Sequence, residues 1–281
     1  MAKIRLATRG SPLALKQAQM TADYLSGRIS DAEFEVVEIR TSGDKNQLLS
    51  LSANGGAGLF TKEIERALLD GVADLAVHSA KDLPTQIPEN LRLCAALPRD
   101  GCRDVLAVRE GVRVPELIAS SSPRRRAQLK RLFPNAVWTE LRGNVHTRLE
   151  KIASGYADAT VLSEAGLLRL GISDFDGVVL TPVKTDICVP AVGQGIIALE
   201  CRAEDFGFYS AFGDAAAFEA LELERAFLAS LGGGCQSAYA ANYDGEFFRF
   251  YHESTGFQKL SFPPKMSRSQ KLAIIRELFR N

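Results

Sequence analysis

Cys235 ends the run Leu231-Gly-Gly-Gly-Cys235, a setting that could present a reactive thiol. Glycine has no Cβ, so the backbone there can adopt positive φ and a bulky group can approach it closely. The alternative is that Cys235 packs as a small apolar residue in a core, as most unpaired cysteines do. Because three glycines supply no side-chain volume to such a core, the run indicates an attachment point on a loop.

A second group of residues that could bind a ligand consists of lysines and arginines. Residues 120–151 contain eight Lys or Arg and two acids, in a chain whose formal net charge is +0. Arg124 and Arg125 fall in the first turn of a predicted helix, where the helix dipole disfavours cations, so they need another reason, and anionic ligands supply one. Guanidinium groups bind carboxylates bidentately, and the interleaved aromatic residues that stack nucleic-acid bases are missing here. The pattern therefore predicts small polycarboxylate ligands, with Arg126, Lys130 and Arg131 on a solvated helix face.

Alternating strands and helices are predicted to position these residues. Capping residues and hydrophobic periodicity predict helices at 12–25, 59–70, 124–133, 145–154 and 164–170. Strands are predicted at 4–7, 34–39, 74–77, 91–96, 105–108, 117–119 and 159–162, together with one that begins at 137–138 and ends in 142–144. This alternation predicts parallel sheets in two lobes with a cleft between them, with ligands at the carboxyl ends of strands. Residues 196–199 are expected to return to the first lobe. The tail is predicted to hold a helix at 215–231, strands at 238–243, 247–251 and 257–260, and a helix at 269–279.

Composition limits the class of protein. The chain has 281 residues, of which 46% are hydrophobic and 24% charged, as in an ordinary soluble globular protein. Its five cysteines show no CxxC spacing and it has three histidines, so neither a disulfide framework nor a metal site is expected. The N-terminus leads directly into a predicted strand, which favours a cytoplasmic protein without a membrane partner.

Seven ordered motifs, spread over about residues 4–242, resemble those of the porphobilinogen deaminase family, also called hydroxymethylbilane synthases. The ordered set is far more specific than any single motif. The motifs are Ala7-Thr-Arg-Gly-Ser-Pro-Leu-Ala14, Gly58-Leu-Phe-Thr-Lys-Glu63, Val77-His-Ser-Ala-Lys-Asp82, Ser121-Ser-Pro-Arg-Arg125, Leu141-Arg-Gly-Asn144, Pro190-Ala-Val-Gly-Gln-Gly195 and Gly233-Gly-Cys-Gln236.

The resemblance implies an α/β fold. Two lobes like those of periplasmic binding proteins, with a cleft between them, are expected together with a small C-terminal α+β domain. Domain 1 would comprise residues 1–95 and 192–212, including a lid loop at 42–58. Domain 2 would comprise residues 96–191 and domain 3 residues 213–281.

The resemblance also implies an activity. A transferase of this family polymerises four porphobilinogens head to tail with release of ammonia, and hydrolysis then frees hydroxymethylbilane in tetrapyrrole (haem and porphyrin) biosynthesis. It carries a dipyrromethane cofactor, here joined by a thioether to Cys235. The expected partners of this cytoplasmic monomer are porphobilinogen and the growing polypyrrole, with neither nucleic acid nor membrane.

Residue roles follow from the same motifs. Asp82 matches the catalytic aspartate. Each pyrrole carries an acetate and a propionate, so basic residues would hold the growing chain. The implied cofactor contacts are Lys81, Ser122, Arg124, Arg125, Arg142 and Asn144, and the implied substrate contacts are Arg9, Ser11, Lys62, Arg148 and Arg169.

Some residues have a structural alternative. Asp82 could simply pair with Lys81 or cap the following turn. His78 could shuttle protons, but a histidine after a buried strand more often forms a structural hydrogen bond, and this is the role we expect. The four cysteines other than Cys235 are expected to be structural, with Cys94 in a core strand.

Three departures from the family pattern stand out. Ala57 replaces a lysine that relatives often carry in the lid. Pro123 and Arg126 replace more typical Leu and Gln, and the tail after Asn242 is shorter with only a faint match.

Two other classes of protein compete with the enzyme. A solute-binding or effector-sensing protein could share the two-lobed architecture, because fold does not decide function, but it would need neither Cys235 nor Asp82. An RNA-binding protein using residues 124–131 would show affinity that falls steeply with salt.

Overall fold

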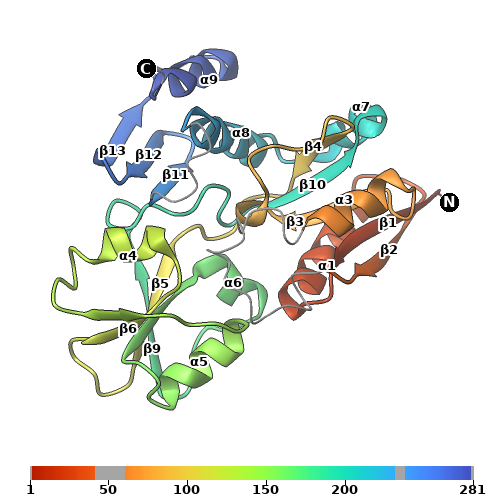
Figure 1. Ribbon diagram of the computed structural model, residues 1–281. Helices are drawn as coiled ribbons and strands as arrows, with labels where there is room; N and C mark the ends of the chain where they lie inside the picture. The colour runs from red at the N-terminus through yellow and green to blue at the C-terminus, as the bar shows by residue number, and fades with distance from the viewer. Residues whose placement is uncertain (1, 42–60, 232–237, 280–281) are drawn as a thin grey trace. The chain divides into compact units, whose positions relative to one another are not determined.

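The computed structural model describes residues 2–41, 61–231 and 238–279 (Figure 1). The predicted lid loop at 42–58 and Cys235 lie outside these residues. The described chain divides into two compact units. Of the described residues, unit 1 comprises 2–41, 61–99, 196–231 and 268–279, and unit 2 comprises 100–195 and 238–267.

Unit 1 is built on a five-stranded sheet with the order β2-β1-β3-β10-β4. Strands β1, β2 and β3 run parallel, and β10 runs antiparallel to both β3 and β4. The strands are β1 (Ala2–Arg9), β2 (Ala32–Ile39), β3 (Leu75–Ser79), β4 (Leu91–Ala96) and β10 (Ile197–Arg202). As predicted, the segment after residue 196 returns to the first sheet.

Helices cover both faces of this sheet because its strands alternate two sets of apolar side chains. Leu6 packs in one core with α1 residues such as Leu25, whereas the next residue, Ala7, packs in another core with Ile64 and Leu68 of α3. The helices of unit 1 are α1 (Pro12–Ser26), α3 (Lys62–Leu69), α7 (Phe206–Tyr209), α8 (Ala215–Ser230) and α9 (Arg268–Glu277), with 3₁₀ turns η1 (Ala80–Asp82), η2 (Ala203–Asp205) and η3 (Ser210–Phe212).

The sheet of unit 2 repeats this plan with the order β7-β6-β8-β5-β9. Strands β6, β7 and β8 are parallel, and β5 is antiparallel to β8 and β9. On opposite faces, Leu149 of α5 packs with Leu162, and Leu129 of α4 packs with Val161. The elements are β5 (Asp104–Arg109), β6 (Leu117–Ala119), α4 (Pro123–Leu129), β7 (Val137–Thr139), α5 (Val145–Ala153), β8 (Ala159–Ser163), α6 (Glu164–Arg169) and β9 (Val178–Val183).

The C-terminal segment contributes to both units. Its antiparallel sheet, β11 (Tyr239–Tyr243), β12 (Phe247–His252) and β13 (Gly256–Ser261), belongs to unit 2, whereas α8 and α9 belong to unit 1. Phe227 of α8 meets Phe279, just after α9, edge to face at 5.7 Å.

The predicted α/β architecture, with two similar lobes and a small C-terminal sheet, is confirmed. The prediction of parallel sheets is wrong for one strand in each lobe, because β5 and β10 oppose both of their neighbours. Hydrophobic periodicity reports which faces of a strand are buried, but it carries no information on strand direction.

Candidate active site

A pocket in unit 1 lies at the carboxyl ends of β1 and β3, where ligands were expected. Its lining brings together three of the predicted site residues, Arg9, Ser11 and Asp82. The other lining residues come from the same elements and from the start of α3: Thr8, Leu13, Ala14, Gln17, Thr61, Ile64, Val77, His78 and Ser79.

Local capping explains why α1 starts at the edge of this pocket. Pro12 occupies the first helical position, where its missing N–H costs nothing, and the Ser11 hydroxyl accepts a hydrogen bond from the Ala14 N–H at 3.3 Å. Further along α1, the Gln17 carboxamide lies 2.8 and 3.0 Å from the Ser79 hydroxyl. These bonds fix the start of α1 against the end of β3, and so hold the walls of the pocket together.

Asp82 sits on the short turn η1 directly after β3. The turn is anchored by the Ala80 N–H, which donates to the Ile196 carbonyl at 3.0 Å, and it closes with the Leu83 N–H donating to the Ala80 carbonyl at 3.3 Å. Both Lys81 and Asp82 are exposed, and Asp82 lines the pocket whereas Lys81 does not. Asp82 is therefore exposed at the lining of the pocket and is not buried in the fold.

His78 has the structural hydrogen bond that was expected of it. It is buried, and its Nε2 lies 3.0 Å from Oε2 of the fully buried Glu200 on β10. Glu65 of α3 is also buried nearby, and burial raises the pKa of its carboxyl. His78 therefore joins β3 to β10 at the pocket wall.

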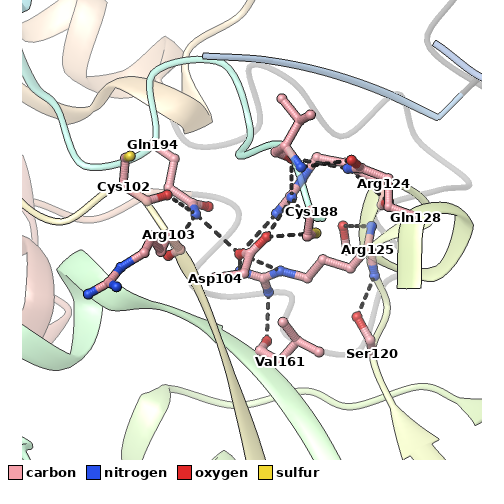
Figure 2. Close-up of polar contacts among 12 residues, drawn as sticks. Cys102, Arg103, Asp104, Ser120, Arg124, Arg125, Gln128, Val161, Cys188 and Gln194 are labelled. Carbon is pink, nitrogen blue, oxygen red and sulfur yellow. Dashed lines mark hydrogen bonds and ion pairs between the residues drawn. The ribbon is translucent and has the colours of Figure 1, made fainter. Parts of the chain in front are cut away.

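A buried ionic cluster forms the second candidate site, in unit 2 (Figure 2). The Asp104 carboxylate, at the start of β5, is fully buried. Its Oδ2 lies 2.6 Å from Nη1 of Arg124, and its Oδ1 lies 3.0 and 2.8 Å from Nε and Nη2 of Arg125. Gln194 donates to Oδ1 at 3.1 Å, and the Cys188 thiol donates to Oδ2 at 3.2 Å.

The charges of this cluster do not balance. Burial alone would raise the pKa of Asp104, but the two guanidinium groups outweigh that effect and hold the pKa well below its usual range. Burial raises the pKa of the Cys188 thiol to about 12, so the thiol is neutral at pH 7. Within the part of the chain that the structure describes, Asp104 is the one acid paired with either arginine. Two guanidinium groups against one carboxylate leave a net positive charge, which suits an anionic ligand.

The helix that carries these arginines begins as predicted. Ser122 caps α4, with Pro123 at the first position, and its hydroxyl accepts from the Arg125 N–H at 3.4 Å. Lys130 and Arg131 are exposed, as expected. The expectation that Arg126 lies on the same solvated face is wrong, because its guanidinium reaches back to the carbonyls of Ser120 and Thr139 at the ends of β6 and β7.

A third group of predicted residues lies in one turn before and within α5. Asn144 caps this helix, its Oδ1 accepting from the Thr147 N–H at 2.9 Å. Arg148 donates from Nε to the Gly143 carbonyl at 2.7 Å, and the exposed Arg142 lies 3.3 Å from Glu140. The turn therefore gathers Arg142, Asn144 and Arg148 at one helix N-terminus.

The two remaining predicted residues lie apart from these groups. Lys62, the first residue of α3, is exposed and is not part of the pocket lining. Arg169 is buried, paired with Asp100 at 2.7 Å and donating to the Gly195 carbonyl at 2.7 Å. Burial lowers the pKa of Arg169, and Asp100 opposes that shift.

Sequence reasoning missed Asp104 and Gln194. Two adjacent arginines in the first turn of a helix call for a compensating acid, and that was the available signal. The chain offers 34 acids, and nothing in their spacing singles out one that lies 20 residues earlier on another element.

Some classes of site are missing from the described chain. It holds no group of three or more His, Cys, Asp or Glu side chains able to bind a metal ion. No helix in residues 2–41, 61–231 or 238–279 combines the length and apolar character needed to cross a bilayer.

Comparisons with known proteins give one consistent result at the level of sequence. A family model described as "Porphobilinogen deaminase, dipyromethane cofactor binding domain" matches residues 4–209. The porphobilinogen deaminase of Syntrophomonas wolfei is 42% identical over 249 residues, covering 86% of this chain and 80% of that protein. The porphobilinogen deaminase of Nitrobacter winogradskyi is 46% identical over 242 residues, covering 83% of this chain and 76% of that protein.

Solved structures resemble the chain only distantly. The periplasmic aliphatic sulphonate binding protein SsuA from Escherichia coli matches with a TM-score of 0.45 and 15% identity, covering 83% of this chain and 71% of that chain. The periplasmic VFT2 domain of BvgS from Bordetella pertussis matches with a TM-score of 0.43 and 17% identity, covering 74% and 83%.

Proposed function

The chain belongs to the porphobilinogen deaminase family, so we propose that Asp82 is the catalytic carboxylate of a porphobilinogen-polymerising enzyme. The enzyme is a transferase of tetrapyrrole biosynthesis, which joins four porphobilinogens head to tail with loss of ammonia and then releases hydroxymethylbilane by hydrolysis. The observation that carries the proposed role is the position of Asp82, exposed on the lining of a pocket that also holds Arg9 and Ser11.

The residues present fit the family's dipyrromethane cofactor, whose pyrroles bear carboxylates. The net positive charge around Asp104 is already desolvated, so an anionic side chain would compensate it without a further cost of burying cations. When bound, the cofactor supplies the pyrrole carbon to which the first substrate is joined. We assign its covalent attachment to Cys235 and its polar contacts to Lys81, Ser122, Arg124, Arg125, Arg142 and Asn144.

Substrate carboxylates are assigned to a separate set of residues. Arg9 and Ser11 are supported by the pocket that they share with Asp82, and Lys62 by its exposure at the start of α3. Arg148 follows the cap of α5 by one turn. For Arg169 the support is the family motif alone, because Asp100 and Gly195 already engage its guanidinium.

Asp82 would act on the charge that appears as ammonia leaves. The substrate pyrrole then becomes a delocalised cation, and a carboxylate beside it is attracted by about 4 kcal/mol at 4 Å and an effective dielectric constant of 20. That energy corresponds to roughly a thousandfold in rate.

The experiment compares Asp82→Asn with Asp70→Asn, another exposed acid of unit 1 that lies off the pocket. Intact mass should show the two-pyrrole adduct on both variants, and Cys235→Ser should abolish it. Turnover of porphobilinogen should collapse in Asp82→Asn and persist in Asp70→Asn. Near-normal product formation by Asp82→Asn would reject the role of this carboxylate.

We also propose the three-domain division at residues 95/96, 191/192 and 212/213, and a cytoplasmic monomer that binds neither nucleic acid nor membrane. Support comes from the family resemblance and from the absence of stacking aromatics among the arginines. Limited proteolysis tests the boundaries, and size-exclusion chromatography with light scattering tests the monomer.

A further inference from the structure

The chain just after Asp82 is held by an arginine that none of the family motifs includes. Arg225, on α8, donates from Nη2 to the carbonyl of Pro84 at 2.8 Å and to the carbonyl of Thr85 at 2.9 Å. These carbonyls follow Asp82 by two and three residues. One guanidinium nitrogen therefore fixes the exit of the turn that presents the carboxylate.

The entrance of the same turn is fixed by β10 and by the residue just before it. The Ala80 N–H donates to the Ile196 carbonyl at 3.0 Å, and His78 pairs with Glu200 at 3.0 Å. Glu200 is fully buried and its negative charge favours the charged form of Arg225, whose pKa is lowered by burial. The Asp82 turn is thus held at its entrance by the Ile196 carbonyl and at its exit by Arg225.

Helix α8, which carries Arg225, is itself held in place by several contacts. It is capped by Asp214, whose Oδ1 accepts from the Ala217 N–H at 2.7 Å. Next to Arg225, the buried Glu224 pairs with Arg99 at 2.6 Å. Since a helix ties its residues together through i to i−4 hydrogen bonds, movement of Arg225 is resisted along the whole of α8.

We propose that Arg225 is a positioning residue for the reaction: it holds the Asp82 turn so that the carboxylate is in place before the substrate arrives. The inference rests on the proposed role of Asp82. The Asp82 side chain is exposed, so packing around it does not hold its carboxylate in one position. Preorganisation must then come from the backbone, and a catalytic group displaced by about 1 Å can cost about a hundredfold in rate.

The chain offers a matched control for a purely structural role. Arg202 in unit 1 also donates from one nitrogen to two carbonyls, those of Leu68 and Ala73, both at 2.9 Å. Those carbonyls lie around the end of α3 and not beside Asp82. Both Arg225→Lys and Arg202→Lys therefore remove a two-carbonyl anchor, one next to the catalytic carboxylate and one away from it. Arg202 also pairs with Asp205 at 2.8 Å, so its substitution should disturb the fold of unit 1 at least as much.

The experiment measures adduct mass, thermal midpoint, kcat and KM for both variants and for Asp82→Asn. We expect both lysine variants to carry the adduct and to melt at lower temperature than wild type. In Arg225→Lys, kcat should fall about tenfold to a hundredfold at nearly constant KM, the pattern of a lost transition-state interaction. In Arg202→Lys, kcat should stay at the wild-type value.

Equal kcat values in the two lysine variants would overturn the inference, and so would a change confined to KM in Arg225→Lys. Activity in Asp82→Asn would instead reject the proposed function, whatever the arginine variants do. If Arg225→Lys does not accumulate in folded form, Pro84→Gly loosens the same turn by adding backbone freedom. That variant should reproduce the fall in kcat with the adduct retained, and wild-type kcat in it would also contradict the inference.

Discussion

Replacing Asp104 by Asn should destabilise unit 2 strongly. The substitution keeps the shape of the side chain but removes the one carboxylate that compensates Arg124 and Arg125. It also turns one acceptor oxygen into an NH₂ group, which faces arginine donors now 2.6 to 3.2 Å away. Breaking a buried ion pair from one side leaves an uncompensated charge and costs about 3–5 kcal/mol.

Urea unfolding at pH 7 measures this loss, with Glu140→Gln as the control. Glu140 also pairs with an arginine, Arg142 at 3.3 Å, but both side chains are exposed, so its substitution should barely change the free energy of unfolding. If the free energy of unfolding of Asp104→Asn is within about 1 kcal/mol of the wild-type value, the variant does not leave two uncompensated buried guanidinium groups, and the argument fails.

The pH dependence gives a second test of the same cluster. The pKa of Asp104 is lowered in the folded protein, so its stabilising effect is complete above the unfolded pKa of about 3.9 and is lost as pH falls toward the folded value. Asp104→Asn has no carboxylate to titrate. The difference in free energy of unfolding between the two proteins should therefore narrow below about pH 4, and a difference that widens in acid would contradict the assignment.

Three further predictions concern a helix cap, the packing around a glycine and a buried carboxyl group. Ser11→Ala removes the cap of α1 and should lower the free energy of unfolding by about 1 kcal/mol in urea titration. Gly213→Ala would place a Cβ 2.9 Å from the Cβ of Ala95 and should cost about 1–3 kcal/mol, whereas Gly207→Ala, with open space around it, should not. Burial raises the pKa of Glu65, so ionisation destabilises the fold as pH rises, and Glu65→Gln should raise the thermal midpoint more at pH 8 than at pH 5.

Much of the secondary structure could be predicted because its signals are local. The strands predicted at 91–96 and 117–119 have those bounds in the structure, and Ser11-Pro12 and Ser122-Pro123 start α1 and α4 as predicted. Strand β9 was missed although Asp176-Gly177 gives a turn signal before it, because its apolar residues do not alternate with polar ones and Pro182 inside the run argues against a strand. The directions of β5 and β10 depend on pairing between distant segments, which no local pattern encodes.

The candidate site divides in the same way. The pocket position of Asp82 could be predicted, because it follows from a strand-to-turn boundary and the rule that ligands gather at carboxyl ends of strands. The partners of Arg124 and Arg125 could not, because Asp104 and Gln194 reach them only after the sheet of unit 2 has formed. Arg126 shows the same limit, since a charge on a short helix can turn back to nearby strand ends.

The proposed mechanism uses buried arginines to bind anions and an exposed aspartate to stabilise a cation. Arg124 and Arg125 are already out of water and oriented by Asp104 and by the carbonyls of Val189 and Val161, so their net charge can attract anionic side chains without a further cost of burying it. Asp82 is exposed, and at 4 Å its attraction for a cation is about 1 kcal/mol in water but about 4 kcal/mol once the effective dielectric constant falls to 20. The bound substrate must therefore exclude water for Asp82 to act. The carboxylate is then correctly placed only if the backbone of its turn is already fixed. An anchor such as Arg225 is thus most valuable beside the exposed carboxylate, where no side-chain packing does the same work.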